Sequence, residues 1–443
     1  MIKKDTILFL IRNNKFLLSL IAIHLVYLTI QIVNQNLYMV DSPEYLYQAK
    51  NIVSNWTFYS GDLQKQINID LYTKRPPIYP LLIASVKLIF KSDLFLIRLQ
   101  SIISILSIQL IRKSFLQIGY NSKYDLISFL LLLLSPAQMV YANMVMAETL
   151  FQFFITLIFF FVVRFVNTNS NRYLVFVNLT IAISALTKPV MYLFVFPSLL
   201  VMLYISLKSK SLKPMMLGLI PIVIIQAFSF WNYKRTDYWH FSSIQTINLV
   251  QYNTYYFNVQ RQGMETAELF LDNQVETAES SRSYSERVHF LKQTSIRVIK
   301  DNPIEYAWFH AKGMFRFFID PGRFDLSNYL GLEEKGNVGF LNHLNNDGIR
   351  GAIKYLSQQD IFLILALILV GIINILKLAG LALFTFEKRI DFRIRAFIVI
   401  LIGYLAFATG PLGASRFAMP FIPIFIFSTS MILSKYFNTL KVH

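Results

Sequence analysis

Two carboxylates stand three residues apart just after the first long apolar stretch of the chain. They are Asp41 and Glu44, in the segment MVDSPEYLYQAKNI. In a structural role, Asp41 or Ser42 caps a helix with Pro43 in its first turn, and Glu44 interacts with the positive end of the helix dipole. In a catalytic role, a carboxylate takes the proton from an attacking hydroxyl. The position of the two acids alone does not decide between these interpretations.

A third acid, Glu148, stands in the segment AETLF. Across residues 125–163 the only other charged residue is Asp125. An acid in such apolar surroundings must lie at the top of a helical hairpin or in a cavity, and intramembrane acids commonly serve function. The structural alternative is a simple turn carboxylate.

Cations recur near the ends of other apolar stretches. They are Lys74 and Arg75 in YTKRPPIYP, Lys188 in ALTKPV, Lys234 and Arg235 in FWNYKRTDYW, and Arg416 in GASRFAMPFIP. Each alone is typical of an interface anchor. Together they predict a basic ring around a few carboxylates on one side of a membrane.

Acids surrounded by cations suit an isoprenoid lipid that carries a phosphate-linked sugar. The cations would hold the phosphate, which leaves as the glycosidic bond breaks. A carboxylate would take the proton of an acceptor hydroxyl as it attacks the anomeric carbon. A single displacement inverts the configuration there and needs no second, closely spaced carboxylate of the kind that retaining hydrolases use.

The composition requires that membrane helices position these residues. Of 443 residues, 55% are hydrophobic and 15% charged, with 40 Phe, and the mean hydropathy is +0.48. These values indicate an all-α, multi-span membrane protein and exclude an ordinary soluble domain. The net charge of +17 is explained by cytoplasmic loops and not by nucleic acid. Without cysteine, the chain has no disulfide and no thiolate metal site.

The apolar stretches predict about ten transmembrane helices. They are residues 16–33, 95–111, 125–142, 146–163, 173–187, 190–206, 214–231, 360–386, 395–411 and 417–434. Residues 77–90 are short for a crossing, which takes roughly 20 residues, and are expected to form a half-helix at the outer face. With this half-helix and a cytoplasmic N-terminus, every short basic loop lies inside. The first stretch, preceded by Lys3, Lys4 and Arg12, is expected to be a retained span.

This topology divides the chain into three parts. Residues 1–231 form an N-terminal transmembrane catalytic module whose first outer loop is about 34–94. Residues 232–358 form an extracytoplasmic, mostly helical loop domain, with helical apolar spacing on both sides of Asn302–Pro303. Residues 359–443 form the C-terminal transmembrane helices.

The order and spacing of these pieces resemble the membrane-embedded C-type (GT-C) glycosyltransferases, close to the bacterial branch of protein O-mannosyltransferases and the aminoarabinose transferase of lipid A. The carrying segments are DSPEYLYQA, RPPIYPLLIA, SPAQMVYANMVMAETLFQFF, ALTKPVM, FWNYKRTDYWHFSSIQTINLVQYN and SRFAMPFIP. The resemblance implies a GT-C fold. It also implies that Asp41 is the essential acid of the first outer loop, that Glu44 is the second acid near it, and that Glu148 is the acid of the second outer loop.

The resemblance further implies a polyprenyl-phosphate sugar donor, such as an undecaprenyl-phosphate donor, used on the outer side of a bacterial inner membrane. The acceptor stays open between a protein, lipid A and a polysaccharide. The family usually has Arg-Asn before its large loop, whereas this chain has WNYKR at 231–235. The candidates for donor binding are Lys74, Arg75, Tyr79, Lys188, Asn232, Lys234, Arg235 and Arg416.

Metal dependence has two alternatives. Related oligosaccharyltransferases use a divalent ion held by acids of both outer loops, and Asp41, Glu44 and Glu148 offer hard oxygen ligands for magnesium or manganese. The mannosyltransferase-like branch generally needs no metal, because Lys and Arg hold a monophosphate leaving group. We favour no metal and no other cofactor.

Three other functions compete with transfer. A transporter of a lipid-linked glycan should carry charges near the bilayer midplane and inverted repeats, whereas here the charges gather at one face and no repeat is seen. A glycan polymerase or ligase relies mainly on outer-loop Arg and His, which fits the early acids less well. The sequence also allows a catalytically inactive scaffold.

Overall fold

The computed structural model describes residues 14–332, 350–351, 353–354, 357 and 360–440. Lys3, Lys4 and Arg12, which flank the expected first span, lie outside the described residues, as does 333–349 of the predicted loop domain. Every regular element in the described part of the chain is a helix, which confirms the predicted all-α class.

Within the described residues, seven helical segments are long and apolar enough to cross a membrane, and each falls on a predicted span. They are α2 (Lys15–Asn34), α5 (Asp93–Leu116), α8 (Glu148–Thr168), η3 with α10 (Pro189–Phe194, Val195–Ser209), α11 with α12 (Lys213–Gly218, Ile220–Thr236), α20 (Ile361–Thr385), and α22, η5 and α23 (Ser415–Ala418, Met419–Phe421, Ile422–Leu440).

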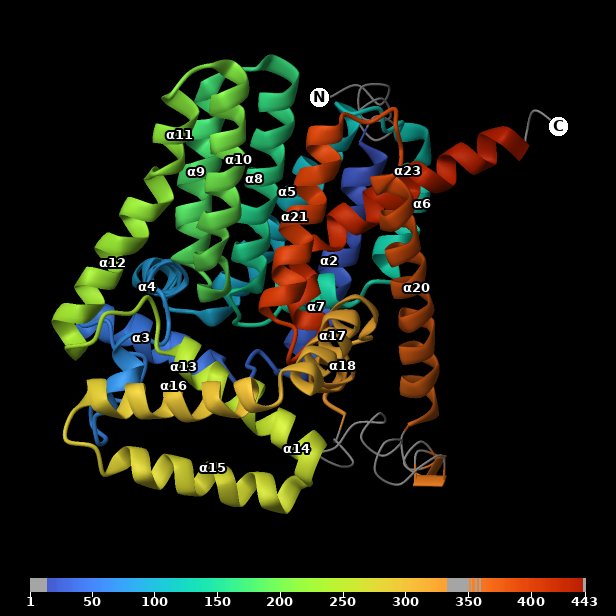
Figure 1. The fold of residues 1–443 in the computed structure, drawn as a ribbon. Helices are drawn as coiled ribbons and strands as arrows, with labels where there is room; N and C mark the ends of the chain where they lie inside the picture. The colour runs from blue at the N-terminus through green and yellow to red at the C-terminus, as the bar shows by residue number, and fades with distance from the viewer. Residues whose placement is uncertain (1–13, 333–349, 352, 355–356, 358–359, 441–443) are drawn as a thin grey trace.

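The other three predicted spans fall on shorter helices. They are α6 and α7 (Asp125–Leu133, Ala137–Ala142), α9 (Asn171–Ala185) and α21 (Phe392–Ala408). The expected helix at 125–142 is broken because Pro136 has no amide hydrogen and restricts the residue before it. Figure 1 shows α9 beside α8 and α10, and places α6 and α7 near opposite ends of the bundle. The count of ten crossings stays a prediction.

Two helices of the predicted first outer loop do not cross the bundle. They are α3 (Ser42–Asn55) and α4 (Ile78–Phe90), separated by the short helix η1 (Ile69–Tyr72). At 13 residues, α4 is too short to span, as the sequence predicted. In Figure 1 it is seen almost end-on, at a steep angle to α8–α10. The rings of Tyr45 and Tyr79 pack edge to face between α3 and α4, with centroids 4.9 Å apart.

A group of helices lies across the same end of the bundle. They are α13 (Ile244–Asn248), the π-helix η4 (Leu249–Tyr255), α14 (Tyr256–Gln262), α15 (Met264–Glu279), α16 (Tyr284–Asp301), α17 (Pro303–Ile319) and α18 (Arg323–Leu330). The break between α16 and α17 falls at Asn302–Pro303, as predicted. Figure 1 shows α15 and α16 running across the bundle axis. In the preceding span, α12 continues to Thr236, past the predicted boundary at 231.

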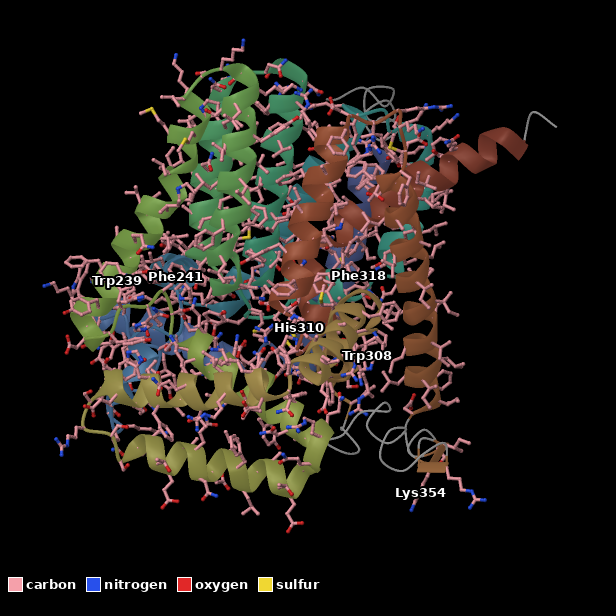
Figure 2. The ribbon with its side chains drawn as sticks, in the orientation of Figure 1. Trp239, Phe241, Trp308, His310, Phe318 and Lys354 are labelled. Carbon is pink, nitrogen blue, oxygen red and sulfur yellow. The ribbon has the colours of Figure 1, made fainter. Side chains whose placement is uncertain are left out.

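Polar contacts attach these crosswise helices to the first outer loop. Tyr284 donates a hydrogen bond of 2.8 Å to Asp70, and Arg287 forms an ion pair with the same carboxylate. Trp239 and Trp308 are 52% and 65% exposed, and Figure 2 shows both near the junction between the bundle and the crosswise helices. Exposed Trp side chains at such a level are typical of a membrane–water interface.

The opposite end of the bundle collects basic turns. The α10–α11 and α20–α21 connections lie there in Figure 1, and Arg393 donates to the Asn169 side chain at 3.3 Å across that end. The basic residues of these turns and of α23 are Lys208, Lys210, Lys213, Lys388, Arg389, Arg393, Arg395 and Lys435. These basic turns therefore lie at the end of the bundle opposite α3 and the crosswise helices.

A close backbone approach fixes α17 against the turn that precedes α22. A Cβ atom built on Gly313 would lie 1.5 Å from the carbonyl oxygen of Gly410. Gly413, in the same turn, has φ +52°, and a Cβ there would lie 2.0 Å from the Gly313 carbonyl oxygen. Only glycine lets these two backbones lie so close.

We predict that Gly313→Ala lowers the free energy of unfolding by about 1–3 kcal/mol, because the added methyl overpacks this contact. Thermal unfolding of the purified protein in detergent measures the effect. Gly371→Ala on α20 is the matched control, since a Cβ there meets nothing within 4 Å. Equal midpoints for the two variants would show that the close approach does not matter for stability.

Candidate active site

The carboxylate of Asp41 lies between two arginines. Arg75 donates to Oδ1 at 2.7 Å, and Arg416 donates to Oδ2. Asp41 stands at the N-cap position of α3, with Pro43 in the first turn as predicted, but makes no capping hydrogen bond. Ser42 does not cap the helix either, because its hydroxyl donates to the Val145 carbonyl at 2.8 Å. The expected capping role of these two side chains is therefore wrong, since the guanidinium groups draw the Asp41 carboxylate away.

Glu44 accepts hydrogen bonds from both cations of the segment KRPP at 74–77. Lys74 donates to Oε1 and Arg75 Nε donates to Oε2, both at 2.6 Å. The backbone carbonyls of Lys74 and Arg75 accept hydrogen bonds from Ser242 at 3.0 Å and from Gln48 at 3.1 Å. Because side chains from two other segments hold this backbone, the two cations face α3 before the proline pair begins α4.

Glu148 is the most enclosed of the three acids, with an exposed fraction of 0%. Its Oε1 accepts from Lys188 at 2.8 Å and from Arg416 Nε. Its Oε2 is buried and has no hydrogen-bond partner among the described residues. The free oxygen gives the site one buried acceptor that nothing in the described chain satisfies.

Arg416 joins the acids of both outer loops, because it contacts Asp41 through one nitrogen and Glu148 through another. The turn before it is held by two acids that the sequence analysis did not single out. Asp320 accepts from the Ser415 backbone amide at 2.6 Å, and Asp325 accepts from the Ser415 hydroxyl at 3.0 Å. Both acids lie in the segment FIDPGRFD, directly after a helix rich in aromatic residues. This segment was the sequence feature that could have indicated their role.

The cluster carries a surplus of positive charge. Four cations (Lys74, Arg75, Lys188 and Arg416) face three carboxylates (Asp41, Glu44 and Glu148), a difference of one charge. An anion entering among them would therefore be attracted.

The neighbouring charges keep Asp41 ionised. Burial alone would raise the pKa of Asp41, but the charges of Arg416 and Arg75 and their hydrogen bonds outweigh it and hold that pKa below the usual range. For Lys188, burial lowers the pKa and the Glu148 carboxylate opposes that shift.

Four predicted donor-binding residues make their contacts elsewhere. Tyr79 is buried and donates to Gln100 at 2.7 Å. Asn232 is buried and donates to the Phe241 carbonyl at 2.7 Å. The Arg235 guanidinium lies 3.7 Å from the Trp231 ring centroid, and exposed Lys234 lies beside Phe230. Seven of the eleven predicted site residues are therefore joined in one ion-pair cluster.

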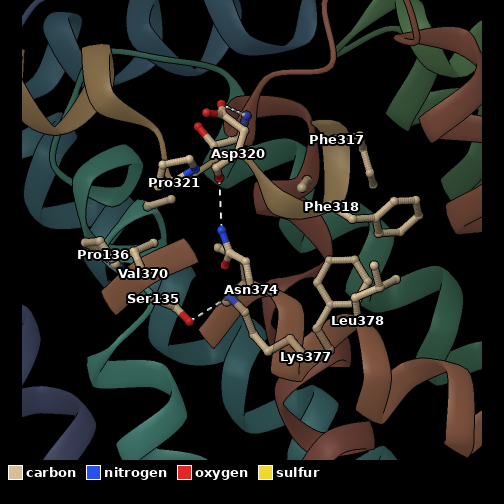
Figure 3. Close-up of a pocket in the computed structure, with 15 residues that line it drawn as sticks. Ser135, Pro136, Phe317, Phe318, Asp320, Pro321, Val370, Asn374, Lys377 and Leu378 are labelled. Atoms are coloured by element: carbon tan, nitrogen blue, oxygen red, sulfur yellow. Dashed lines mark hydrogen bonds between the residues drawn. The ribbon is translucent and has the colours of Figure 1, made fainter. Parts of the chain in front are cut away.

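A small cavity of about 30 Å³ adjoins the Ser415 turn. Figure 3 shows Asn374 donating to the Asp320 carbonyl and Lys377 donating to the Ser135 hydroxyl, at 2.9 Å each. Lys377 is buried within the α20 span, and the described residues provide no acid that pairs with it. From the sequence, this lysine was expected only to be part of the apolar stretch 360–386.

Most of the carboxylate oxygens that could hold a divalent metal ion are already engaged by cations. Within the described residues, no group of three or more His, Cys, Asp or Glu side chains is arranged to hold one. Both oxygens of Asp41 and both of Glu44 already accept from Lys or Arg. A metal ion would have to displace Arg75 and Arg416 and would add charge to a cluster that is already positive.

A family profile described as dolichyl-phosphate-mannose-protein mannosyltransferase matches residues 74–231. No curated protein sequence matches the chain. The apo oligosaccharyltransferase of Archaeoglobus fulgidus is similar in structure, with 16% identity and a TM-score of 0.51 over 97% of this chain and 51% of that chain.

Two further structures are more distant. AglB of Archaeoglobus fulgidus, in complex with an inhibitory peptide and a dolichol-phosphate, has 13% identity and a TM-score of 0.48, over 98% of this chain and 51% of that chain. ArnT of Cupriavidus metallidurans, bound to undecaprenyl phosphate, has 15% identity and a TM-score of 0.39, over 90% and 77%. The chain thus spans about half the length of the archaeal enzyme. The fold shared with the apo archaeal enzyme confirms the resemblance to the GT-C fold, and the family match confirms the resemblance to the mannosyltransferase type over residues 74–231.

We predict that Glu148→Gln lowers the free energy of unfolding by about 3–5 kcal/mol, because it leaves buried cations without their counter-charge. Chemical or thermal unfolding in detergent measures the loss. Glu305→Gln is the matched control, since Glu305 is 62% exposed in its pair with Arg261 and such pairs contribute about 1 kcal/mol or less. If the two variants were equally stable, the ion pairs of Glu148 would not support the fold.

Proposed function

We propose that this chain is an inverting glycosyltransferase that moves a sugar from a polyprenyl-phosphate donor to an acceptor hydroxyl on the extracytoplasmic side of a bacterial inner membrane. One observation carries the proposal: the Asp41 carboxylate lies between two guanidinium groups in a cluster with one surplus positive charge. A base and a phosphate site therefore occupy the same place.

Donor binding is the first step. The donor phosphate is anionic, and Arg guanidinium groups bind phosphate as well as carboxylate oxygens. When the phosphate arrives, Arg75 and Arg416 exchange part of their contact with Asp41 for contact with the phosphate. Glu44 and Glu148 keep the same cations in place from their other sides. This exchange frees an oxygen of Asp41 and makes the carboxylate more basic.

Transfer follows from that exchange. Asp41 takes the proton of the acceptor hydroxyl, and the acceptor oxygen forms a bond to the anomeric carbon. The bond between that carbon and the phosphate oxygen breaks on the opposite face, so the configuration inverts. The phosphate leaves with the bonding electron pair, and Lys74, Arg75, Lys188 and Arg416 stabilise its charge. No step in this scheme requires a metal ion.

Two further observations support the choice of a polyprenyl-phosphate donor and the proposed orientation of the protein in the membrane. The matched family is described by its use of a dolichyl-phosphate sugar, which is a polyprenyl phosphate. The basic turns lie at the end of the bundle opposite α3 and the crosswise helices, which favours an outer location for the ion-pair cluster.

We predict that Asp41→Asn lowers kcat about 10²–10⁴-fold, the usual contribution of a general base. The KM for the donor should not rise, because the cations lose a competing anion. Transfer from a radiolabelled lipid-linked sugar, by protein reconstituted in liposomes, measures both constants. Asp62→Asn, a change of another acid of the first outer loop, is the control and should leave both constants unchanged. Full activity of Asp41→Asn would contradict the proposal.

We also predict that the pH profiles of kcat/KM and kcat differ. In the free protein Arg416 and Arg75 hold the Asp41 pKa below the usual range, so the carboxylate stays ionised as the pH falls to about 5. The profile of kcat/KM, which reports the free enzyme, should show no loss from this group above that pH. In the donor complex the cations are shared and the pKa rises, so kcat should fall at a higher pH. Coincident acid limbs would exclude the exchange of partners.

A further inference from the structure

A groove of about 470 Å³ opens beside the π-helix η4 and faces α15. Its lining combines three tyrosines with three hydrogen-bonding side chains and one leucine: Gln251, Tyr252, Tyr255, Tyr256, Glu268, Leu271 and Asp272. Its lining residues belong to η4, α14 and α15, and Figure 1 shows the course of α14 and α15. Its volume is within the range of small-ligand sites, roughly 300–1,000 Å³.

The polar groups of the groove are available to a ligand. Asp272 and Gln251 are exposed and have no hydrogen-bond partner among the described residues. Glu268 accepts only from the Tyr255 hydroxyl, at the long distance of 3.5 Å. Together they present carboxylate and amide oxygens that can accept hydrogen bonds from hydroxyl groups.

The aromatic groups provide flat surface beside these acceptors. The rings of Tyr252 and Tyr256 are nearly parallel, with an interplanar angle of 17° and centroids 5.9 Å apart. Tyr256 is 45% exposed. Leu271, which lines the groove, packs against a small apolar core of buried residues from η4, α15 and α16.

The chain that forms the groove begins beside the ion-pair cluster, because the Ser242 hydroxyl donates to the Lys74 carbonyl at 3.0 Å and α13 leads from there into η4. Burial raises the pKa of Tyr252, with further contributions from Tyr256 and Asp41, while Arg416 and Arg75 oppose the shift. Tyr252 is at the centre of the π-helix η4, and π-helical turns are frequent at functional sites.

We propose that this groove binds the acceptor and that the acceptor is an uncharged glycan, held with one sugar stacked on the tyrosines and a hydroxyl presented to Asp41. The inference rests on the proposed glycosyl transfer and names the acceptor that it leaves open. Sugars carry C–H faces that pack on aromatic rings and hydroxyls that donate to carboxylate and amide oxygens, which matches both halves of the lining.

The charges of the groove and of the ion-pair cluster disfavour the other acceptor classes. Glu268 and Asp272 repel a phosphorylated lipid headgroup at the groove. The surplus positive charge around Asp41 repels the side chains of a basic peptide at the reacting end. An uncharged, hydroxyl-rich chain meets neither penalty.

The experiment uses the full-length protein in nanodiscs and three fractions from envelopes of source cells that lack it. These probes are the released polysaccharide, the extracted lipid and the delipidated protein. Saturation-transfer NMR measures binding of each fraction, and transfer kinetics with the polysaccharide measure KM and kcat. The groove variants are Tyr256→Ala and Asp272→Asn, both at exposed positions.

We expect saturation transfer to the polysaccharide and a rise in its KM of at least tenfold in both groove variants, with donor KM unchanged. Glu279→Gln, a change of an exposed acid at the far end of α15, and Tyr233→Ala on α12 are the controls and should behave as the unchanged protein. Binding of the lipid or protein fraction instead, binding of no fraction, or an unaltered polysaccharide KM in the groove variants would overturn the inference.

The design separates this inference from the proposed function. If Asp41→Asn abolishes transfer while the groove variants keep normal acceptor kinetics, the transferase stands and the glycan groove fails. If the unchanged protein transfers nothing from lipid-linked sugars to any fraction, the proposed function itself fails.

Discussion

The sharing of Arg416 between Asp41 and Glu148 is the interaction on which the rest of the structure depends. The three residues come from the start, the first third and the end of the chain, so their contact closes the helical bundle around the site. Charges removed from water are costly unless each is paired and hydrogen-bonded. Acids and cations alternate in the cluster, so each charge is paired. Each of the three acids contacts two cations, and two of the four cations contact two acids.

Several segments hold the side chains of that cluster in place. Asp320 and Asp325 fix the turn before Arg416. The glycine contact between α17 and that turn sets how closely their two backbones approach. The proline pair before α4 keeps Lys74 and Arg75 at the bundle end. A site assembled from so many segments is positioned by rigid elements rather than by one loop, which suits chemistry that depends on placement.

Much of this could be predicted from the sequence, because single residues have strong local effects there. The apolar stretch 77–90 is too short to span a membrane, and Asn302–Pro303 breaks a helix. Isolated acids in apolar segments indicated a polar site. The pairing of charges was not predictable. Asp41 gives up its expected cap because two arginines from distant segments compete for it, and Tyr79 lies near the cluster in sequence but donates to Gln100.

Other features that the sequence did not predict have local causes. Pro136 breaks the expected helix at 125–142, and this proline is visible in the sequence. Asp320 and Asp325 escaped notice because their role is to position another residue, and hydrogen bonds to a distant backbone leave no pattern in sequence. Lys377 was hidden for a different reason, since one lysine in a long apolar stretch hardly changes its hydropathy.

The most direct test of the exchange of partners at Asp41 is a cryo-electron microscopy structure of the full chain with a polyprenyl phosphate bound. If the partners exchange, phosphate oxygens will lie within hydrogen-bonding distance of Arg416 and Arg75, and at least one oxygen of Asp41 will be released from its ion pairs. A phosphate bound elsewhere, with both ion pairs of Asp41 unbroken, would contradict the exchange.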